Sequence, residues 1–229
     1  MNEKKRVIYT CITGGYENIA DPLFVNLDWD YICFTDMKPN DEKVSTLNSI
    51  WTFKPIPSNL LGLSPVKQQR MIKICPHLYL PEYTESLYVD GSIDIISDIN
   101  PFIQNYCKDC DIVIRNHPDR NCIYDEASTV IRVGKDLASI VEPQISRYKC
   151  SEFPHNFGLN ETGIIYRKHN EPRVAKIMEA WKNEILIGSH RDQLSFNYVL
   201  WKLNEKIKSI NLNLFSNPYF KWYYKHNRQ

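Results

Sequence analysis

The fold is decided by the stretch Ser86-Leu87-Tyr88-Val89-Asp90-Gly91-Ser92-Ile93-Asp94. An apolar run, typical of a buried strand, ends in an acid, and a Gly-Ser pair and a second acid follow. In open α/β sheets, ligands bind at the carboxyl ends of the strands, so Asp90 stands where chemistry is expected. If the extended conformation continues, the alternation of side chains puts Asp90, Ser92 and Asp94 on one face.

Two acids so close together point either to a cation or to a turn. Two carboxylates ~4 Å apart repel by ~4 kcal/mol at an effective dielectric constant of 20, so they are solvated, protonated or bridged by a cation. Oxygen ligands of this kind suit Mg²⁺ or Mn²⁺ shared with a diphosphate. The alternative is an Asp-Gly turn after the strand, with Asp94 capping the next segment. The stretch alone leaves both interpretations open.

The rest of the chain alternates short apolar or β-branched runs with longer helical patterns. This alternation is typical of an α/β sheet with crossover helices, and we expect a mostly parallel central sheet flanked by helices. Strands are predicted at residues 6–13, 30–35, 50–54, 86–89, 111–115, 162–166 and 207–210. Helices are predicted to begin at Pro65 and at Asn100, and to cover residues 123–131, 135–146, 172–186 and 190–203.

The helix that begins at Pro65 carries two kinds of side chain. Ser64 is its predicted N-cap, and proline suits the first helical position. Its apolar stripe comprises Val66, Met71, Ile74 and Leu78. Its other side carries the basic residues Lys67, Arg70, Lys73 and His77 at a spacing of three or four residues.

Length, charge and composition exclude several classes of protein. The chain has 229 residues, 28 Lys plus Arg against 27 Asp plus Glu, and a net charge of +1, too balanced for a general nucleic-acid binder. Its apolar runs fall far short of the ~20 residues that cross a bilayer. The first residues lack the apolar core of a signal peptide, so a cytoplasmic location is expected. We expect one domain over residues 1–215 and an aromatic, basic tail over residues 216–229.

The seven cysteines have two interpretations. Several lie in apolar runs, which indicates buried free thiols in a reducing compartment. Cys107, Cys110, His117 and Cys122 also form a C-x2-C-x6-H-x4-C pattern that has ligand types suited to zinc. A predicted strand at residues 111–115 lies between the two halves of this pattern, which argues against the zinc site.

Taken together, the motifs resemble the GT-A class of nucleotide-sugar glycosyltransferases. Within that class, the chain resembles a family of glycosyltransferase-like domains of bacteria and plants, of the turgor-regulation and mucilage-related type. The resemblance covers most of the chain and rests on the order and spacing of its pieces. They are VIYTCITGGY from Val7, CFTD from Cys33, RMIKICPH from Arg70, YVDGSI from Tyr88, HPDRNCIYDEA from His117, ETGIIYR from Glu161 and RDQLSF from Arg191.

The resemblance implies a GT-A-like fold and a nucleotide-sugar site. Thr13, Gly14 and Tyr16, with Asp36, would hold the base and ribose, and Arg70 or Lys73, rather than Lys67, would contact the diphosphate. The D-x-D motif of the class falls on Asp90-Gly91-Ser92, where a serine replaces the second acid. The implied metal ligands are therefore Asp90, Ser92, Asp94 and a late histidine, His226, and the implied cofactors are Mn²⁺ or Mg²⁺ and a UDP-sugar.

The resemblance also implies roles for Asp192 and Gln193, which match a late Asp-Gln pair that contacts donor-sugar or acceptor hydroxyls. The alternative is that Asp192 caps a helix, because Ser189 to Asp192 form a capping-box pattern. The expected activity is a hexosyl transfer, by analogy retaining, onto a saccharide or lipid-linked acceptor of polysaccharide biosynthesis. The alternative function is a nucleotide- or glycan-binding module without turnover, which the serine at position 92 favours.

Three further features keep alternatives open. Arg120, after the predicted fifth strand, either binds phosphate beside His117 or pairs with Asp125 or Glu126. Glu161 either reaches the acceptor or is solvated at the start of its strand. The aromatic and basic residues from Asn217 to His226 suit a lid over the nucleotide, a contact with the inner face of a membrane, or packing on the domain itself.

Overall fold

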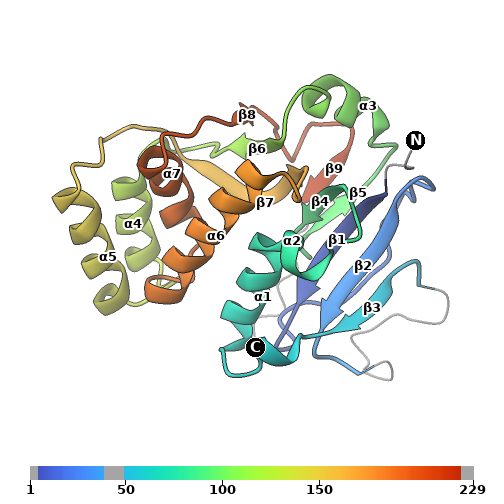
Figure 1. Cartoon of the computed structure of the whole chain (residues 1–229), viewed down its shortest axis with the longest axis horizontal. Helices are drawn as coiled ribbons and strands as arrows, with labels where there is room; N and C mark the ends of the chain where they lie inside the picture. The colour runs from blue at the N-terminus through green and yellow to red at the C-terminus, as the bar shows by residue number, and fades with distance from the viewer. Residues whose placement is uncertain (1–4, 39–48, 223–229) are drawn as a thin grey trace.

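A seven-stranded sheet forms the centre of the protein, in the order β3-β2-β1-β4-β7-β6-β8, with helices on its faces (Figure 1). The computed structural model describes residues 5–38 and 49–222. The strands of this sheet are β1 (Arg6–Ile12), β2 (Asp30–Thr35), β3 (Thr52–Pro55), β4 (Glu85–Val89), β6 (Ile112–Asn116), β7 (Asn160–Arg167) and β8 (Lys208–Ile210). A second, two-stranded sheet pairs β5 (Ile93–Ile95) with β9 (Phe220–Trp222).

The helices connect these strands and cover both faces. They are η1 (Ser58–Leu60), α1 (Pro65–Ile74), α2 (Pro76–Tyr79), α3 (Asn100–Phe102) continued by the π-helical η2 (Ile103–Cys107), α4 (Ile123–Arg132), α5 (Ala138–Cys150), α6 (Pro172–Ile187) and α7 (Gln193–Lys202). Figure 1 shows α4, α5 and α7 grouped to one side of the sheet, with α6 between them and α1. Within the described ranges, no helix has the length and hydropathy needed to span a bilayer.

The strand directions bring several loops to one edge of the sheet. β2, β3 and β4 all run parallel to their neighbours around β1, so their carboxyl ends lie together. β7 runs antiparallel to β4, which places the start of β7, at Asn160 to Thr162, at that same edge. This GT-A-like arrangement confirms the predicted α/β fold with a mostly parallel sheet.

Three apolar clusters hold the layers together. On one face of the sheet, Tyr9 of β1 packs with Met71 of α1 and Trp181 of α6, and all three are fully buried or nearly so. On the other face, Ile8 packs with Phe102 and Phe220. A third cluster lies between α4, α5 and α7. The central strands β1, β4 and β7 are therefore buried on both faces along nearly their whole length, as expected when helices cover both.

All seven predicted strands and the predicted helices are present, with ends shifted by a few residues. The sequence did not predict β5 and β9, because each has three residues and pairs only with the other. Helix α7 begins at Gln193 rather than at 190, because Asp192 caps it through a hydrogen bond that Gln193 N donates to Asp192 Oδ1 (3.0 Å).

The predicted apolar stripe of α1 is wrong in part, since Val66 and Leu78 are 42% and 49% exposed. Lys73, on the other side of the helix, has a side chain only 1% exposed. The reason is that this side of α1 faces the sheet edge, where Lys73 finds carboxylates. Asp90, Ser92 and Asp94 also do not continue an extended strand, since Ile93 N donates to Asp90 O (2.9 Å) and closes a turn.

The described part of the tail packs on the domain itself. Phe220 is 1% exposed, and its ring lies 5.2 Å from that of Phe102, at nearly a right angle. Ile96 N donates to Tyr219 O (2.9 Å) beyond the end of the β5–β9 ladder. For residues 216–222, the packing alternative is therefore the one observed, while His226 lies outside the described residues.

We predict that Phe220→Ala lowers the free energy of unfolding by about 3 to 5 kcal/mol, because it empties a buried aromatic site. Urea denaturation measures this loss, and Lys221→Ala, on the exposed position next to it, is the matched control. A loss below about 1 kcal/mol for Phe220→Ala would show that the tail is not part of the folded core.

Candidate active site

A buried ammonium group lies at the carboxyl edge of the sheet. Lys73 Nζ contacts Asp192 Oδ2 at 2.7 Å, Thr162 Oγ1 at 3.1 Å and Asp90 Oδ1 at 3.4 Å. A lysine ammonium carries three protons, so these three partners satisfy it completely. Its partners come from α7, β7 and the end of β4, which means that one side chain of α1 joins three elements distant in sequence.

Asp192 balances this charge from inside the protein. Its side chain is 3% exposed, and its Oδ2 also lies 3.5 Å from Arg70 Nε. Burial alone would raise the pKa of Asp192, but Arg70 and Lys73 outweigh it and hold this pKa well below its ordinary value. Asp192 is therefore an anion at any physiological pH. Its burial makes it a partner for Lys73 and Arg70, with little surface left for a substrate.

Asp90 is the exposed member of the network. Its side chain is 31% exposed, and its Oδ1 accepts a hydrogen bond from Tyr88 OH (2.7 Å) as well as the contact from Lys73. Gln69 Nε2 donates in turn to Tyr88 OH, and Lys73 Nζ lies 5.0 Å from the centre of the Tyr88 ring. Both contacts fall on Oδ1, so neither Tyr88 nor Lys73 occupies the second oxygen of Asp90.

Two glycines make room for further carboxylates around Asp90. A Cβ on Gly91 would lie 2.2 Å from Glu17 Oε2, and a Cβ on Gly163 would lie 2.8 Å from Glu161 Oε1 and 3.3 Å from Asp90 Oδ2. Burial and the Asp90 carboxylate raise the pKa of Glu17 to about 7, although Arg70 opposes this. The space that these glycines leave is therefore filled by carboxylate oxygens, which any larger residue would displace.

The loop after β1 has its own fixed geometry. Gly14 N donates to both oxygens of Asp36, at 3.1 and 2.9 Å, and Thr13 Oγ1 donates to Pro65 O (2.7 Å). Gly14 has a φ of +66°, in the left-handed region that favours glycine, and a Cβ there would approach Pro65 to 3.2 Å. Asp36, just after the end of β2, thus fixes the loop from Thr13 to Tyr16.

Two cavities open at this edge of the sheet. One, of about 450 Å³, is lined by the end of β1, the loop from Glu17 to Leu23, Trp51 and the segment from Val89 to Ile95, and Asp90 is among its walls. The other, of about 500 Å³, is lined by Thr35 to Lys38, Phe53 to Ile56 and Leu61, and includes Asp36. Each is large enough for part of a drug-sized ligand.

The structure brings most of the predicted site residues to one place. Arg70, Lys73, Asp90 and Asp192 form one connected network, and Thr13, Gly14 and Asp36 form a second beside it. Gly91, Ser92 and Asp94 line the cavity of about 450 Å³, but Asp94 Oδ1 accepts from Leu23 N (3.0 Å). Tyr16 is 56% exposed, and Gln193 is 7% exposed at the start of α7.

Several other predicted features have side-chain partners within the described part of the chain. Arg120 Nε donates to Glu126 Oε2 (2.6 Å), so the loop-scaffold alternative is the one observed for Arg120. Glu161 lies 2.9 Å from Arg115 Nε, in an ion pair at the start of β7. The zinc pattern of Cys107, Cys110, His117 and Cys122 is not assembled. Among the described residues, the group of metal-ligand side chains that does come together is a different one, Cys75, His77 and Glu179.

Sequence reasoning missed three residues of the site. Tyr88 stands two positions before Asp90 in the same strand, so the two-residue period of a strand is a signal that could have found it. Thr162 comes from the start of β7, which reaches this edge only because β7 is antiparallel. Glu17 lies in a loop, where no period indicates which side chains turn inward.

The arrangement offers fixed positive charge beneath one accessible carboxylate. Arg70 is drawn into the same network, since Asp192 and Asp90 raise its pKa even though burial opposes this. Groups preorganised in this way stabilise charge that develops on a ligand without having to reorient. A site with a carboxylate at the rim and two cations behind it suits a ligand that is both anionic and able to share a metal ion.

Comparison with known protein families identifies the same kind of fold. The family model described as TOD1/MUCI70, glycosyltransferase-like domain, matches residues 1–228. A comparison with curated proteins found no match.

We predict that Asp192→Asn lowers the free energy of unfolding by about 3 to 5 kcal/mol, because it leaves the Lys73 ammonium buried without its closest counter-charge. Lys73→Met combined with Asp192→Asn should cost less than the sum of the two single variants in urea denaturation. Glu82→Gln breaks the exposed pair with Lys54 and should cost less than about 1 kcal/mol. Strict additivity of the Lys73 and Asp192 variants would contradict the coupling.

The raised pKa of Glu17 predicts a specific dependence of stability on pH. Between the ordinary pKa of 4.5 and the folded pKa of about 7, folded Glu17 keeps a proton that the unfolded chain has lost, so stability falls as pH rises through this interval. Glu17→Gln should remove this loss and gain up to about 3 kcal/mol relative to wild type between pH 4.5 and 7.5.

Denaturation at a series of pH values measures the effect of Glu17→Gln. The exposed Glu142 of α5 provides the control variant, Glu142→Gln, which should follow wild type at every pH. A constant difference between Glu17→Gln and wild type across this range would show that Glu17 ionises as an ordinary surface carboxylate.

Proposed function

Because the chain belongs to the TOD1/MUCI70 family of glycosyltransferase-like domains, we propose that it transfers a hexosyl group from a nucleoside-diphosphate sugar, of which a UDP-sugar is the first candidate. The proposed acceptor is a saccharide or a lipid-linked saccharide of polysaccharide assembly, reached at the inner face of a membrane when it is lipid-linked. The observation that carries the proposal is Asp90, at the wall of a cavity of about 450 Å³, with the buried Lys73 directly behind it.

The nucleotide is assigned to the loop after β1. Thr13, Gly14 and Tyr16 stand at the carboxyl end of β1, and Asp36 ties this loop to the end of β2. Asp36 also lines the second cavity, of about 500 Å³, whose walls include Phe53, Pro55 and Ile56. We assign the base and ribose to this side, because an apolar wall beside a carboxylate suits a flat heterocycle and ribose hydroxyls.

The donor set is compatible with a divalent cation held in part by the donor. The missing side chains of Gly91 and Gly163 leave room for the carboxylates of Glu17 and Glu161 close to Asp90, and one oxygen of Asp90 has neither the Tyr88 nor the Lys73 contact. Magnesium is usually held by one or two carboxylates together with substrate phosphates. In this proposal Asp90 is the carboxylate ligand of Mn²⁺ or Mg²⁺, with Ser92, Asp94 and His226 as the further candidates. When bound, the ion supplies positive charge to the leaving diphosphate.

The residues of this chain contribute electrostatics and position. As the glycosidic bond breaks, negative charge grows on the leaving diphosphate, and the field of Arg70 and Lys73 stabilises it. Asp192 holds both cations in place through contacts of 3.5 and 2.7 Å. Gln193, at the first turn of α7, is our candidate for orienting donor or acceptor hydroxyls. We propose retention of the anomeric configuration, which the NMR spectrum of the product reports.

A second candidate function is a nucleotide- or glycan-binding module without turnover. The observation that favours it is Ser92, which offers a hydroxyl where the D-x-D motif has an acid. The two functions differ in one measurement, the slow hydrolysis of a panel of nucleotide sugars with Mn²⁺. Hydrolysis of any donor supports the enzyme, and tight UDP binding without hydrolysis supports the module.

We predict that Asp90→Asn abolishes transfer and donor hydrolysis and weakens Mn²⁺-dependent nucleotide binding at least tenfold. Its melting temperature should change by no more than about 2 °C, because Asp90 is partly exposed and asparagine keeps the hydrogen bond to Tyr88. Asp28→Asn, at a half-exposed carboxylate outside both cavities, is the control and should retain activity. Full activity of Asp90→Asn would remove Asp90 from the mechanism.

A further inference from the structure

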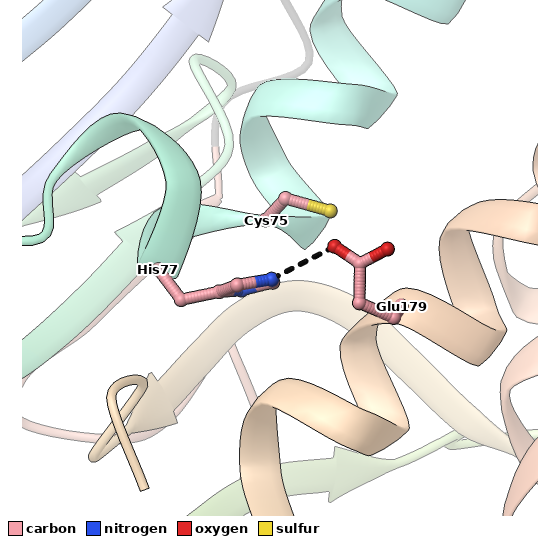
Figure 2. Close-up of side chains that lie close together, drawn as sticks. All are labelled: Cys75, His77 and Glu179. Atoms are coloured by element: carbon pink, nitrogen blue, oxygen red, sulfur yellow. Dashed lines mark hydrogen bonds and ion pairs between the residues drawn. The ribbon is translucent and has the colours of Figure 1, made fainter. Parts of the chain in front are cut away.

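A second cluster of reactive side chains lies where α1 meets α2. Cys75 stands between these two helices, His77 belongs to α2, and Glu179 reaches them from α6. Figure 2 shows the Cys75 sulfur and the His77 ring both directed at the Glu179 carboxylate. One ligand atom from each of the three residues lies within 4.8 Å of the other two, and His77 Nε2 is 3.0 Å from Glu179 Oε1.

The three ligand types fit zinc better than they fit the hard ions of a diphosphate site. Thiolate, imidazole and carboxylate are the groups that bind zinc in proteins, at about 2.0 to 2.3 Å. Bonds of that length in a tetrahedron place ligand atoms about 3.3 to 3.8 Å apart. The separation of His77 and Glu179 is already close to this value, and the Cys75 sulfur, within 4.8 Å of both ligand atoms, has to move closer for zinc to bind.

The surroundings keep His77 and Glu179 in suitable states, whereas burial raises the pKa of the Cys75 thiol to about 12, so this thiol has to lose its proton as the metal binds. Burial lowers the pKa of His77, against the effect of Glu179, so the ring is neutral and able to bind a metal. His77 Nδ1 is buried and has no hydrogen-bond partner among the described residues, so Glu179 is what orients the ring. Lys182 pairs with the other oxygen of Glu179, Oε2, which holds this carboxylate toward the cluster.

We propose that Cys75 Sγ, His77 Nε2 and Glu179 Oε1 form a zinc site that fastens the α1–α2 junction to α6. The fourth position belongs to water, because the Glu179 side chain is 40% exposed while Cys75 is fully buried. When zinc binds, the S–H bond of Cys75 breaks, a zinc–sulfur bond forms and the proton passes to solvent, with no change in oxidation state. The site is separate from the proposed function and does not depend on it.

The fold gives this zinc site a structural consequence. α1 carries Arg70 five residues and Lys73 two residues before Cys75, and α6 lies against α1 through buried apolar side chains. A metal that joins the end of α1 to α6 therefore fixes the helix on which the two cations of the active site stand. The expected result is a higher melting temperature with zinc, because only the folded chain brings the three ligands together.

The test is a titration of the reduced, metal-free, full-length protein with Co²⁺, whose bond to a thiolate gives a near-ultraviolet charge-transfer band. We expect one equivalent of Co²⁺ to develop this band and Zn²⁺ to displace it. Cys75→Ala should lose the band, and Glu179→Gln, a surface change that leaves the core intact, should weaken binding at least tenfold. Cys110→Ala changes a half-buried thiol that packs against the apolar cluster of Ile8, Phe102 and Phe220, and it should keep both the band and the affinity.

The outcomes that overturn the proposal are equally specific. Absence of the band in wild type at a large excess of Co²⁺, or its persistence in Cys75→Ala, would show that these residues bind no metal. Its loss in Cys110→Ala would move the site to the Cys107 and Cys110 pair. Equal zinc-dependent increases of melting temperature in wild type and Glu179→Gln would also contradict the site.

Discussion

The fold depends on one buried ion pair, Lys73 with Asp192, to which the rest of the candidate site is attached. Neither side chain has more than 3% of its surface in contact with solvent, and the two lie 2.7 Å apart. A charge in such a place is tolerated only when it is paired and fully hydrogen-bonded, which is why Thr162 and Asp90 complete the shell. The pair links α1 to α7 across the end of the sheet, and Asp90 is the carboxylate through which it meets the cavity.

The elements of the fold could be predicted from local patterns, whereas their contacts could not. The strand ending at Asp90 and the helix opening with Ser64 and Pro65 carry period and capping signals, and both are present. The basic residues of α1 were placed on the side opposite its apolar stripe, but the spacing along the helix did not show that Lys73 is buried. Its burial depends on carboxylates 17 and 119 residues away in sequence, Asp90 and Asp192, and no local pattern contains that information.

Because contacts between distant residues cannot be predicted from local patterns, the sequence identified only some residues of the candidate site and did not identify the cysteine cluster. Thr13, Asp36, Arg70 and Asp90 were found through a resemblance in motif order, and the sheet brings them to one edge. Tyr88 and Glu17 were missed, since their roles follow from a hydrogen bond and from the gap beside Gly91. Cysteine spacing offered a zinc pattern at Cys107, Cys110, His117 and Cys122, against which the strand between its halves argued. Spacing along the chain does not report which side chains a turn between two helices brings together.

The central claim is that the edge of the sheet at Asp90 binds the donor nucleotide. A crystal structure of the protein soaked with UDP and Mn²⁺ tests it most directly. The account predicts diphosphate density beside Asp90, with the uridine on the side of Asp36 and the loop after β1. Nucleotide density at any other surface, with the cavity at Asp90 left to solvent, would contradict it.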